Sequence, residues 1–337
     1  MAAREAAAAR AWTAPGRICP VGYRYAPRVF DRAPDFEAET LYVVGGLYGN
    51  VEALDALAAM AARERRPVTF VFNGDFHWFD AAPEDFRAIA AGVAPHRRLR
   101  GNVETEIAGE DSGAGCGCAY PFDVSDTEVT RSNEILARLR ESARTCGGRE
   151  ALGALPMHLV ARVGDARIGI VHGDAGSLAG WGFAHDRLDD PAHARWIESA
   201  FRDARVDIFA STHTCLPAFR HFELPRGADG VVANNGAAGM PNFSGTHFGL
   251  VTRISTSRSP HRLFALETKG VQVEALPLRF DQARWVDRFA AAWPKGSPAH
   301  AAYFRRIVAG PRYTPAQAEP RRVALGYRAT GTTTETA

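Results

Sequence analysis

The stretch Leu41–Asp75 reads LYVVGGLYGNVEALDALAAMAARERRPVTFVFNGD and predicts one complete strand–turn–helix–strand unit. Its two apolar runs, Leu41–Val44 and Pro67–Phe72, have the length and composition of buried strands. Asn50 is a suitable N-cap for the helix between them, because its side chain can accept a hydrogen bond from the first helical turn. Within that helix the apolar residues recur at helical spacing, at Leu54, Leu57, Ala58 and Ala61.

The same order of elements continues on the C-terminal side of this unit. Pro83 opens a second predicted helix, and Leu99 lies in a third short strand. Strands that alternate with helical crossovers are parallel, so we expect a parallel group of strands here. Further along, Ser125 and Glu128 form a predicted capping box for a helix that reaches about Arg144.

The second half of the chain is richer in strands. One helix, Pro191–Asp203, lies among them, and two helices close the sequence at Asp281–Trp293 and Pro298–Val308. The candidate strands are Met157–Val163, Arg167–Val171, Val206–Ala210, Val231–Ala233, Phe248–Ile254, Leu263–Glu267 and Val271–Ala275. This order predicts an α/β protein with α+β character in parts.

Polar residues follow four of the predicted strands, at the point where each strand ends. They are Asp75, Asn102, His172 and His213. In an open α/β sheet, ligands bind beyond the carboxyl ends of the strands. Oxygen and nitrogen donors of these types hold divalent cations. The sequence therefore predicts that the four side chains converge on one metal site.

Composition excludes several classes of protein. The 337 residues are 46% hydrophobic, and 40 basic against 38 acidic residues give a net charge of only +2. We therefore expect no specific nucleic-acid binding, which needs a concentration of basic charge. No run is long and apolar enough to span a bilayer, and the first residues lack the apolar core of a secretory signal. Five cysteines, an odd number, argue against a disulfide framework, so the expected compartment is the cytoplasm.

The order of the motifs resembles that of the calcineurin-like metallophosphoesterase family, over about residues 41–254. The family pattern opens with Asp-x-His, continues with Gly-Asp, Gly-Asn and His-Gly, and closes with Gly-His-x-His. The matching segments are Gly74-Asp75, Gly101-Asn102, His172-Gly173 and Thr212–Pro217. The stretch GNVEALDAL, residues 49–57, is also similar to the helix after the opening motif in the bacterial phosphodiesterase-like branch.

The resemblance implies a fold, a cofactor and a reaction. The fold is a four-layer double β-sandwich flanked by helices, with a two-metal centre at one sheet edge. Asp75 would bridge the two ions, and Asn102, His172 and His213 would complete the second ion's site. The implied reaction is hydrolysis of a phosphoester by a metal-activated water. The ion would be Mn, Zn, Fe or Mg, and the substrate a phosphorylated small molecule or a nucleotide.

The departures from the family pattern fall on the first metal site. Gly46 and Tyr48 stand where the opening Asp and His are expected, and Cys215 stands where the second closing His is expected. All ligands of the second site are present, which predicts one well-formed metal site. Val103 stands where many members carry the histidine that protonates the leaving group.

Several residues near the motifs have both a functional and a structural interpretation. His77, two residues after Asp75, is the best replacement for the missing acid or else a loop histidine. Tyr48 could contact phosphate or ligate the ion, although packing on its loop is preferred. Cys215 could be a thiolate ligand, although a small buried residue is preferred. The pair Cys116 and Cys118 could clamp a metal or form a strained bridge, but a flexible glycine-rich insertion is the preferred interpretation.

We expect a lead-in at 1–38, a phosphoesterase domain at 39–280 with an insertion at 105–124, a helical extension at 281–327 and a flexible tail at 328–337. Two alternatives to an active phosphoesterase stay open. The lost ligands favour a catalytically inactive, phosphoesterase-like binding or regulatory protein. The turn VVGGLYGN after a strand favours a dinucleotide-binding enzyme, although its glycine spacing is not G-x-G-x-x-G.

Overall fold

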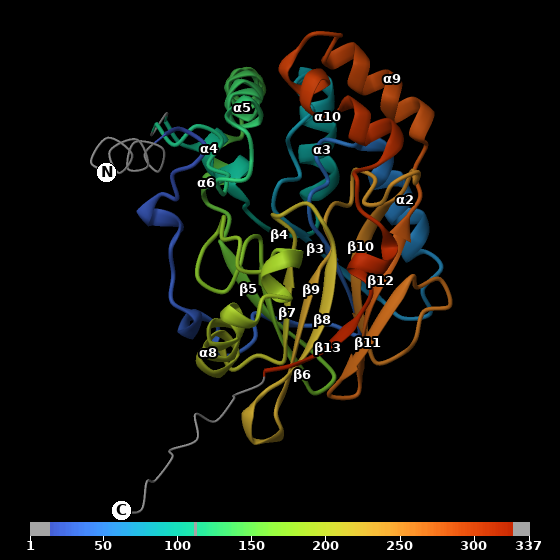
Figure 1. Cartoon of the computed structure of the whole chain (residues 1–337). Helices are drawn as coiled ribbons and strands as arrows, with labels where there is room; N and C mark the ends of the chain where they lie inside the picture. The colour runs from blue at the N-terminus through green and yellow to red at the C-terminus, as the bar shows by residue number, and fades with distance from the viewer. Residues whose placement is uncertain (1–13, 111–112, 326–337) are drawn as a thin grey trace, which may run out of the picture.

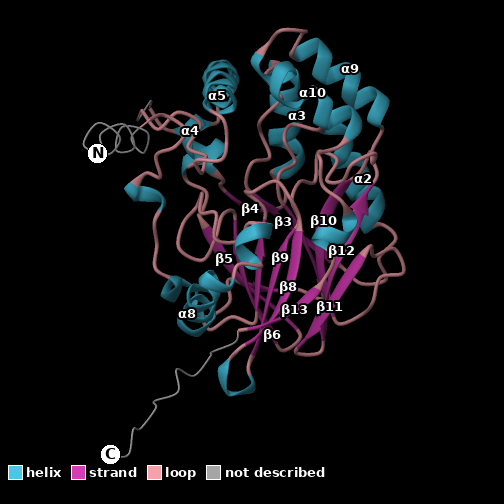
Figure 2. Ribbon diagram, viewed as in Figure 1, coloured by secondary structure: helices cyan, strands magenta, loops and turns pink. Residues whose placement is uncertain are grey.

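The computed structural model describes residues 14–110 and 113–325 of the chain (Figure 1). Two sheets form the centre of the molecule, and helices cover their outer faces (Figure 2). The predicted tail at 328–337 and the first part of the predicted lead-in lie outside the described residues. None of the helices in the described part of the chain is long and apolar enough to cross a membrane.

The six-stranded sheet contains the predicted strand–turn–helix–strand unit of residues 41–75. Its strand order is β11-β12-β10-β2-β3-β4. The bounds are β2 (Thr40–Val44), β3 (Val68–Asn73), β4 (Arg97–Leu99), β10 (Gly249–Ser255), β11 (Phe264–Thr268) and β12 (Val271–Leu278). β2, β3 and β4 are parallel, as the helical crossovers predict, whereas β10, β11 and β12 are antiparallel.

The seven-stranded sheet comes almost entirely from the second half of the chain. Its order is β1-β5-β6-β7-β9-β8-β13. The bounds are β1 (Phe36–Glu37), β5 (His158–Val163), β6 (Ala166–Val171), β7 (Ile208–Ser211), β8 (Ala218–Glu223), β9 (Asp229–Asn234) and β13 (Arg321–Ala324). β6, β7 and β9 are parallel neighbours.

Three of these strands were not predicted, and their sequences explain why. β8 contains Arg220 and His221, which interrupt its apolar pattern although both side chains are buried. β1 has two residues and β13 reads RRVA, so neither shows an apolar run. Strand pairing, rather than apolar burial, places β13 at the sheet edge, where it lies parallel to β8.

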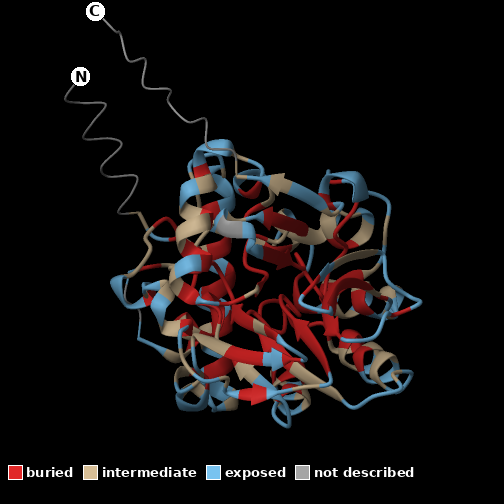
Figure 3. Cartoon of the chain, turned by 90° about the horizontal axis from the view of Figure 1, so that it is seen from below, coloured by how far each residue is buried: buried red, intermediate tan, exposed pale blue. Residues whose placement is uncertain are grey.

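The two sheets face each other across one apolar layer (Figure 3). Alternation along β2 sends Leu41 and Val43 into this layer and Tyr42 and Val44 to the helical side. Opposite them, Ile168 and Ile170 of β6 contribute to the same cluster. Each such side chain stabilises the fold by about 1.5–3 kcal/mol when it leaves water. This shared core makes the two sheets one structural unit.

Helices form the two outer layers. The outer side of the six-stranded sheet carries α2 (Val51–Ala61), α3 (Pro83–Val93), α5 (Asp126–Cys146), α9 (Gln282–Ala292) and α10 (Pro298–Ala309) (Figure 1). The other sheet is covered by α8 (Ala194–Ala204), which follows a short 3-10 turn. The predicted four-layer sandwich flanked by helices is confirmed.

Two of the helix starts follow the predicted capping chemistry. Asn50 Oδ1 accepts a hydrogen bond from Ala53 N at 3.1 Å, and Ser125 Oγ accepts one from Glu128 N at 3.2 Å. The closing helices pack on the first half of the chain rather than standing apart from it. Trp293 Nε1 donates to Phe79 O at 2.7 Å. The remaining short helices are α4 (Asn102–Ala108), α6 (Arg149–Gly153), α7 (His185–Leu188) and α11 (Pro315–Ala318).

Candidate metal centre

Four strand ends bring the predicted donors to one place. Asp75 follows β3, Asn102 begins α4 directly after β4, His172 follows β6 and His213 follows β7. His172 Nε2 lies 3.1 Å from Asn102 Oδ1, 3.3 Å from Asp75 Oδ2 and 3.1 Å from His213 Nδ1. The ligand atoms of Asp75, His172 and His213 all lie within 4.8 Å of one another. We call Asp75, Asn102, His172 and His213 the donor cluster.

Two backbone carbonyls fix how the histidines of the cluster are protonated. His172 Nδ1 lies 2.9 Å from Asn73 O, and His213 Nε2 lies 3.0 Å from Cys118 O. A carbonyl oxygen only accepts hydrogen bonds, so each of these nitrogens carries the hydrogen. In the neutral rings, His172 Nε2 and His213 Nδ1 are therefore bare acceptors, and they face each other. Backbone carbonyls behind metal-bound histidines orient them in this way.

The other two donors also present oxygen lone pairs. Asn102 Nδ2 donates to Cys116 O at 2.9 Å, which turns its Oδ1 towards His172. The Asp75 carboxylate receives a hydrogen bond at Oδ1 from Val103 N at 3.2 Å and faces His172 with Oδ2. The centre of the cluster thus holds four acceptor atoms, and burying acceptors without a donor is costly.

A divalent cation matches this arrangement in chemistry, because carboxylate and amide oxygens and imidazole nitrogens are its usual ligands. The separations from His172 Nε2 to the other three donors are 3.1–3.3 Å, and the ligand atoms of Asp75, His172 and His213 lie within 4.8 Å of one another, so one ion could contact them together. The four residues are at most 5% exposed, so an ion bound there would be largely shielded from water.

The electrostatics of the cluster favour one added positive charge. Burial, and after it the neighbouring His172, lower the pKa of His213 to about 3. Burial also opposes protonation of His172, but the Asp75 carboxylate outweighs it and raises that pKa. One proton, or one cation in its place, can therefore satisfy the facing nitrogens.

Glu104, which the sequence analysis did not single out, holds the loops that carry two of the donors. Its buried carboxylate accepts from Asp75 N at 2.7 Å, Gly101 N at 2.8 Å and His77 N at 3.2 Å. Burial and the nearby Asp75 raise the pKa of Glu104. An i, i+3 spacing to the glycine that caps α4 was the available signal.

The preferred interpretation of the Cys116–Cys118 segment as a flexible insertion is wrong. Both cysteines are buried, and their carbonyls accept the hydrogen bonds from Asn102 and His213 described above. Asn102 Nδ2 also lies 3.5 Å from Cys118 Sγ. Both thiols are free, so no bridge forms between them. The glycines around the two cysteines interrupt any helical or strand periodicity, so the sequence pattern does not reveal this role.

The residues at the first-site positions lie beside the cluster and contact one another. Tyr48 OH is 2.8 Å from Cys215 Sγ, and Cys215 Sγ is 3.3 Å from His213 O. Cys215 is not part of the group formed by Asp75, His172 and His213. Its role as a thiolate ligand, and a catalytic role for Tyr48, stay predictions. Burial and the nearby Cys215 raise the pKa of Tyr48.

His77 is enclosed rather than presented to a ligand. Its ring stacks on Phe86 at 3.9 Å between centroids, and its Nδ1 lies 2.5 Å from Asp80 Oδ2. Within the described residues, His77 forms hydrogen bonds with Asp80 and Glu104 and with none of the four donors. Its Nε2 is buried with no described partner. The catalytic acid role remains a prediction, for which the enclosed Nε2 would have to reach the ligand.

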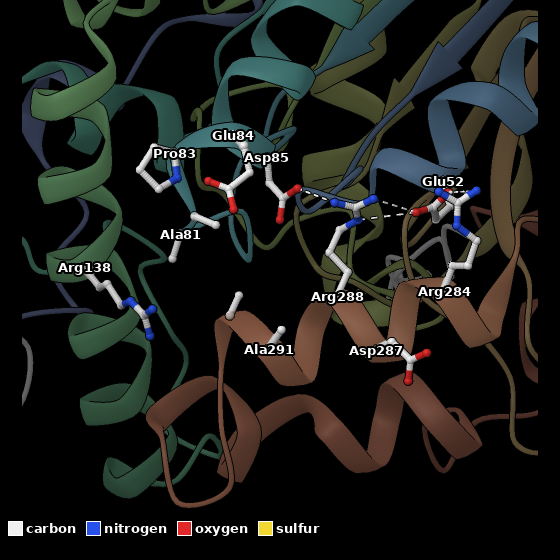
Figure 4. A pocket seen from close by; sticks show the side chains of 12 residues that line it. Glu52, Ala81, Pro83, Glu84, Asp85, Arg138, Arg284, Asp287, Arg288 and Ala291 are labelled. Carbon is white, nitrogen blue, oxygen red and sulfur yellow. Dashed lines mark hydrogen bonds and ion pairs between the residues drawn. The ribbon is translucent and has the colours of Figure 1, made fainter.

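Two cavities lie elsewhere in the structure, and no residue of the donor cluster lines either of them. One, of about 610 Å³, lies between α3, α5 and α9 (Figure 4). Three of its charged side chains form ion pairs: Arg288 pairs with Asp85 at 2.6 Å and with Glu52 at 3.0 Å. The other, of about 880 Å³, lies beside the end of α2 and contains the ion pair between Arg253 and Glu64.

Comparisons with known proteins give a fold but no sequence match. No family model matches the chain, and no curated protein does. The chain is similar to the crystal structure of a hypothetical protein from Pyrococcus horikoshii OT3, at 16% identity and a TM-score of 0.55, over 81% of this chain and 99% of that one. It is also similar to a metallophosphoesterase from Sphaerobacter thermophilus, at 18% identity and a TM-score of 0.46, over 81% of this chain and all of that one. The likeness to the Pyrococcus structure shows that the two chains share one fold.

Proposed function

We propose that the protein is a metallophosphoesterase that uses one divalent cation held by Asp75, Asn102, His172 and His213. The observation that carries the proposal is the pair of bare nitrogens, His172 Nε2 and His213 Nδ1, facing each other at 3.1 Å. The order of the motifs along the chain supports the same assignment. Only a cation or a proton stabilises such a pair, and the two oxygen donors beside it favour a cation.

The residues of the chain have separate tasks in this reaction. A bound cation would supply Lewis acidity towards a phosphoryl oxygen and would acidify a water molecule. Asp75 and Asn102 would set the charge and shape of the site. The carbonyls of Asn73 and Cys118 would keep both imidazoles in the ligating tautomer. This division of roles needs no movement of the donors between substrate binding and reaction.

The proposed enzyme lacks an evident acid for the leaving group. Val103 is buried, and its N–H is engaged by the Asp75 carboxylate. His77 is held by Asp80. We therefore expect substrates with good leaving groups, such as aryl phosphates, to react faster than alkyl phosphates.

The test is hydrolysis of p-nitrophenyl phosphate and bis(p-nitrophenyl) phosphate with Mn²⁺, Zn²⁺, Fe²⁺ or Mg²⁺. We expect turnover with at least one ion. His213→Ala should reduce the turnover rate by more than the roughly 10–100-fold loss that is typical when a residue hydrogen-bonded to a metal ligand is replaced. His247→Ala, at an exposed histidine, is the matched control and should react like the unmodified protein. Absence of turnover with every ion, while a tightly bound metal is present, would reject catalysis.

That last outcome defines the second candidate function, a binding or regulatory protein. The observation in its favour is that three first-site positions carry Gly46, Tyr48 and Cys215. In that case Asp75→Ala should remove metal binding, and phosphate affinity should persist in the unmodified protein without product formation.

A further inference from the structure

The three residues that replace the first-site ligands form one packed unit. Tyr48 OH contacts Cys215 Sγ at 2.8 Å. The Tyr48 ring lies against Gly46: a Cβ at that position would come within 2.8–3.0 Å of the ring atoms and of the hydroxyl. The aromatic ring therefore takes the space that an aspartate side chain at position 46 would need. We call Gly46, Tyr48 and Cys215 the replacement unit.

This unit is joined directly to the donor cluster. Tyr48 N donates to Asp75 O at 3.0 Å, and Gly46 N donates to Gly74 O at 3.2 Å. Cys215 is two residues from His213. Tyr48 and Cys215 have φ angles of 54° and 61°, in the left-handed region that non-glycine residues rarely adopt. Two such residues side by side next to a metal centre are typical of a constrained functional site.

A cation from the C-terminal helices completes the unit. Arg306 of α10 donates through Nη2 to Cys215 O at 2.5 Å. Its Nε is buried and has no described partner, and no carboxylate pairs with it among the residues that the structure describes. A guanidinium has five N–H donors, so this single contact leaves capacity for a ligand. Arg306 and Cys215 are both partly exposed, which gives a ligand access from solvent.

The replacement unit and Arg306 offer hydrogen-bond donors where a metal site needs acceptors. A metal site needs lone pairs that point at a cation. The replacement unit and Arg306 instead offer a hydroxyl, a thiol and a guanidinium, which can all donate hydrogen. Hydrogen-bond donors with one fixed positive charge are complementary to an anionic oxygen, and arginine is well suited to bind phosphate.

We infer that Arg306 and Tyr48 bind an anionic phosphoryl oxygen of the ligand beside the metal site, so that a guanidinium takes the place of a second metal ion. The inference rests on the proposed function and specifies its ligand site: one cation and one arginine hold the phosphate from two sides. Both charges would come from elements far apart in the sequence, because Arg306 of α10 lies 91 residues beyond Cys215 in the loop after β7.

The experiment is calorimetric titration of inorganic phosphate into protein loaded with Mn²⁺, together with the metal content of each variant. Arg306→Gln should weaken phosphate binding about 10–100-fold, the range for a lost charged hydrogen bond. Tyr48→Phe, which keeps the ring against Gly46, should weaken it about 2–10-fold. Arg305→Gln, at the exposed neighbouring residue of α10, is the matched control and should bind phosphate normally. All variants should hold one metal equivalent.

Several results would overturn the inference. The first is that the unmodified protein does not bind phosphate. The second is that phosphate binding is unchanged in both Arg306→Gln and Tyr48→Phe. The third is that the protein holds two tightly bound metal equivalents. If Arg306→Gln does not fold, Tyr48→Phe and Arg306→Lys decide, and the lysine variant should retain part of the affinity. Arg306-dependent phosphate binding without turnover would reject the proposed catalysis but uphold the inference. Turnover together with phosphate binding that does not depend on Arg306 would uphold the proposed catalysis but reject the inference.

Discussion

Asn73 O and Cys118 O decide what the two histidines of the donor cluster can bind. Each carbonyl holds a hydrogen on one ring nitrogen and leaves the other nitrogen bare. A proton and a metal ion therefore compete for the same facing pair. Because ligation requires neutral histidines, acid should release the ion.

Gly101 is the residue whose substitution most directly tests the shape of the cluster. Its φ of −93° is accessible to any residue, so backbone strain plays no part. A Cβ at this position, however, would come within 2.2 Å of Asp75 Oδ1 and 2.9 Å of the His172 ring. Gly101→Ala should therefore displace the carboxylate and weaken metal affinity by at least about tenfold, as measured by competition with a chelating dye.

The control for this substitution is Gly22→Ala. A Cβ at Gly22 meets nothing within 4 Å, so metal affinity and thermal stability should both stay unchanged. Equal metal affinity in Gly101→Ala and in the unmodified protein would show that the Asp75 carboxylate can move aside without cost. It would then not be a required ligand.

At the scale of elements, α5 depends on local chemistry at its N-terminus. Ser125 and Glu128 each accept a hydrogen bond from the backbone N–H of the other. Removal of a serine N-cap costs about 1 kcal/mol of the free energy of unfolding. Ser125→Ala should lower the urea midpoint correspondingly without changing metal content.

Ser244→Ala provides the matched comparison for that helix start. Ser244 is exposed, and its side chain forms no hydrogen bond with another described residue. Its replacement should leave the urea midpoint within about 0.5 kcal/mol of the unmodified value. If both variants unfold alike, the capping box does not stabilise α5 in the intact protein.

At the scale of the whole molecule, Arg220 ties the edge of the seven-stranded sheet to the chain around it. Its guanidinium is fully buried and contacts Asp189 at 2.5 and 2.8 Å. It also donates to the carbonyls of Gln317 and Glu319, beside α11. Segments about 100 residues apart are therefore held by one side chain.

This ion pair makes part of the stability depend on pH. Burial alone would raise the pKa of Asp189, but the hydrogen bonds and charge of Arg220 lower it below its ordinary value. The folded state thus binds the proton less readily than the unfolded state. The stabilisation is fully present above about pH 5 and is lost as the pH falls through the folded pKa, below about 3.9.

Asp189→Asn should remove this contribution. The variant should be less stable at pH 7 by about 1–3 kcal/mol, because a charged hydrogen-bond acceptor of Arg220 is lost. It should also lose less stability than the unmodified protein between pH 6 and pH 3, as measured by urea unfolding at each pH. An identical pH dependence in both proteins would assign the acid sensitivity to other carboxylates.

Much of the fold could be predicted because its signals are local. The length and composition of the apolar runs identified β2, β3 and β6, and the helical spacing identified α2. The parallel order of β2, β3 and β4 followed from the crossovers between them. β8 was missed because Arg220 is buried through ion pairing, which an apolar pattern cannot reveal.

The sequence alone determined that each donor lies just beyond the end of a strand, where parallel strands of one sheet gather their ligands. Asp75 and Asn102 follow strands of the six-stranded sheet, whereas His172 and His213 follow strands of the seven-stranded sheet, so only the packing of the two sheets brings the two pairs together. Tertiary structure decided how they are used. The carbonyl of Cys118 reaches His213 from 95 residues away, Tyr48 meets Cys215 across 167 residues, and Arg306 meets it across 91. No periodicity encodes such contacts, because they depend on loops whose conformation is fixed only when the sheets and helices have packed.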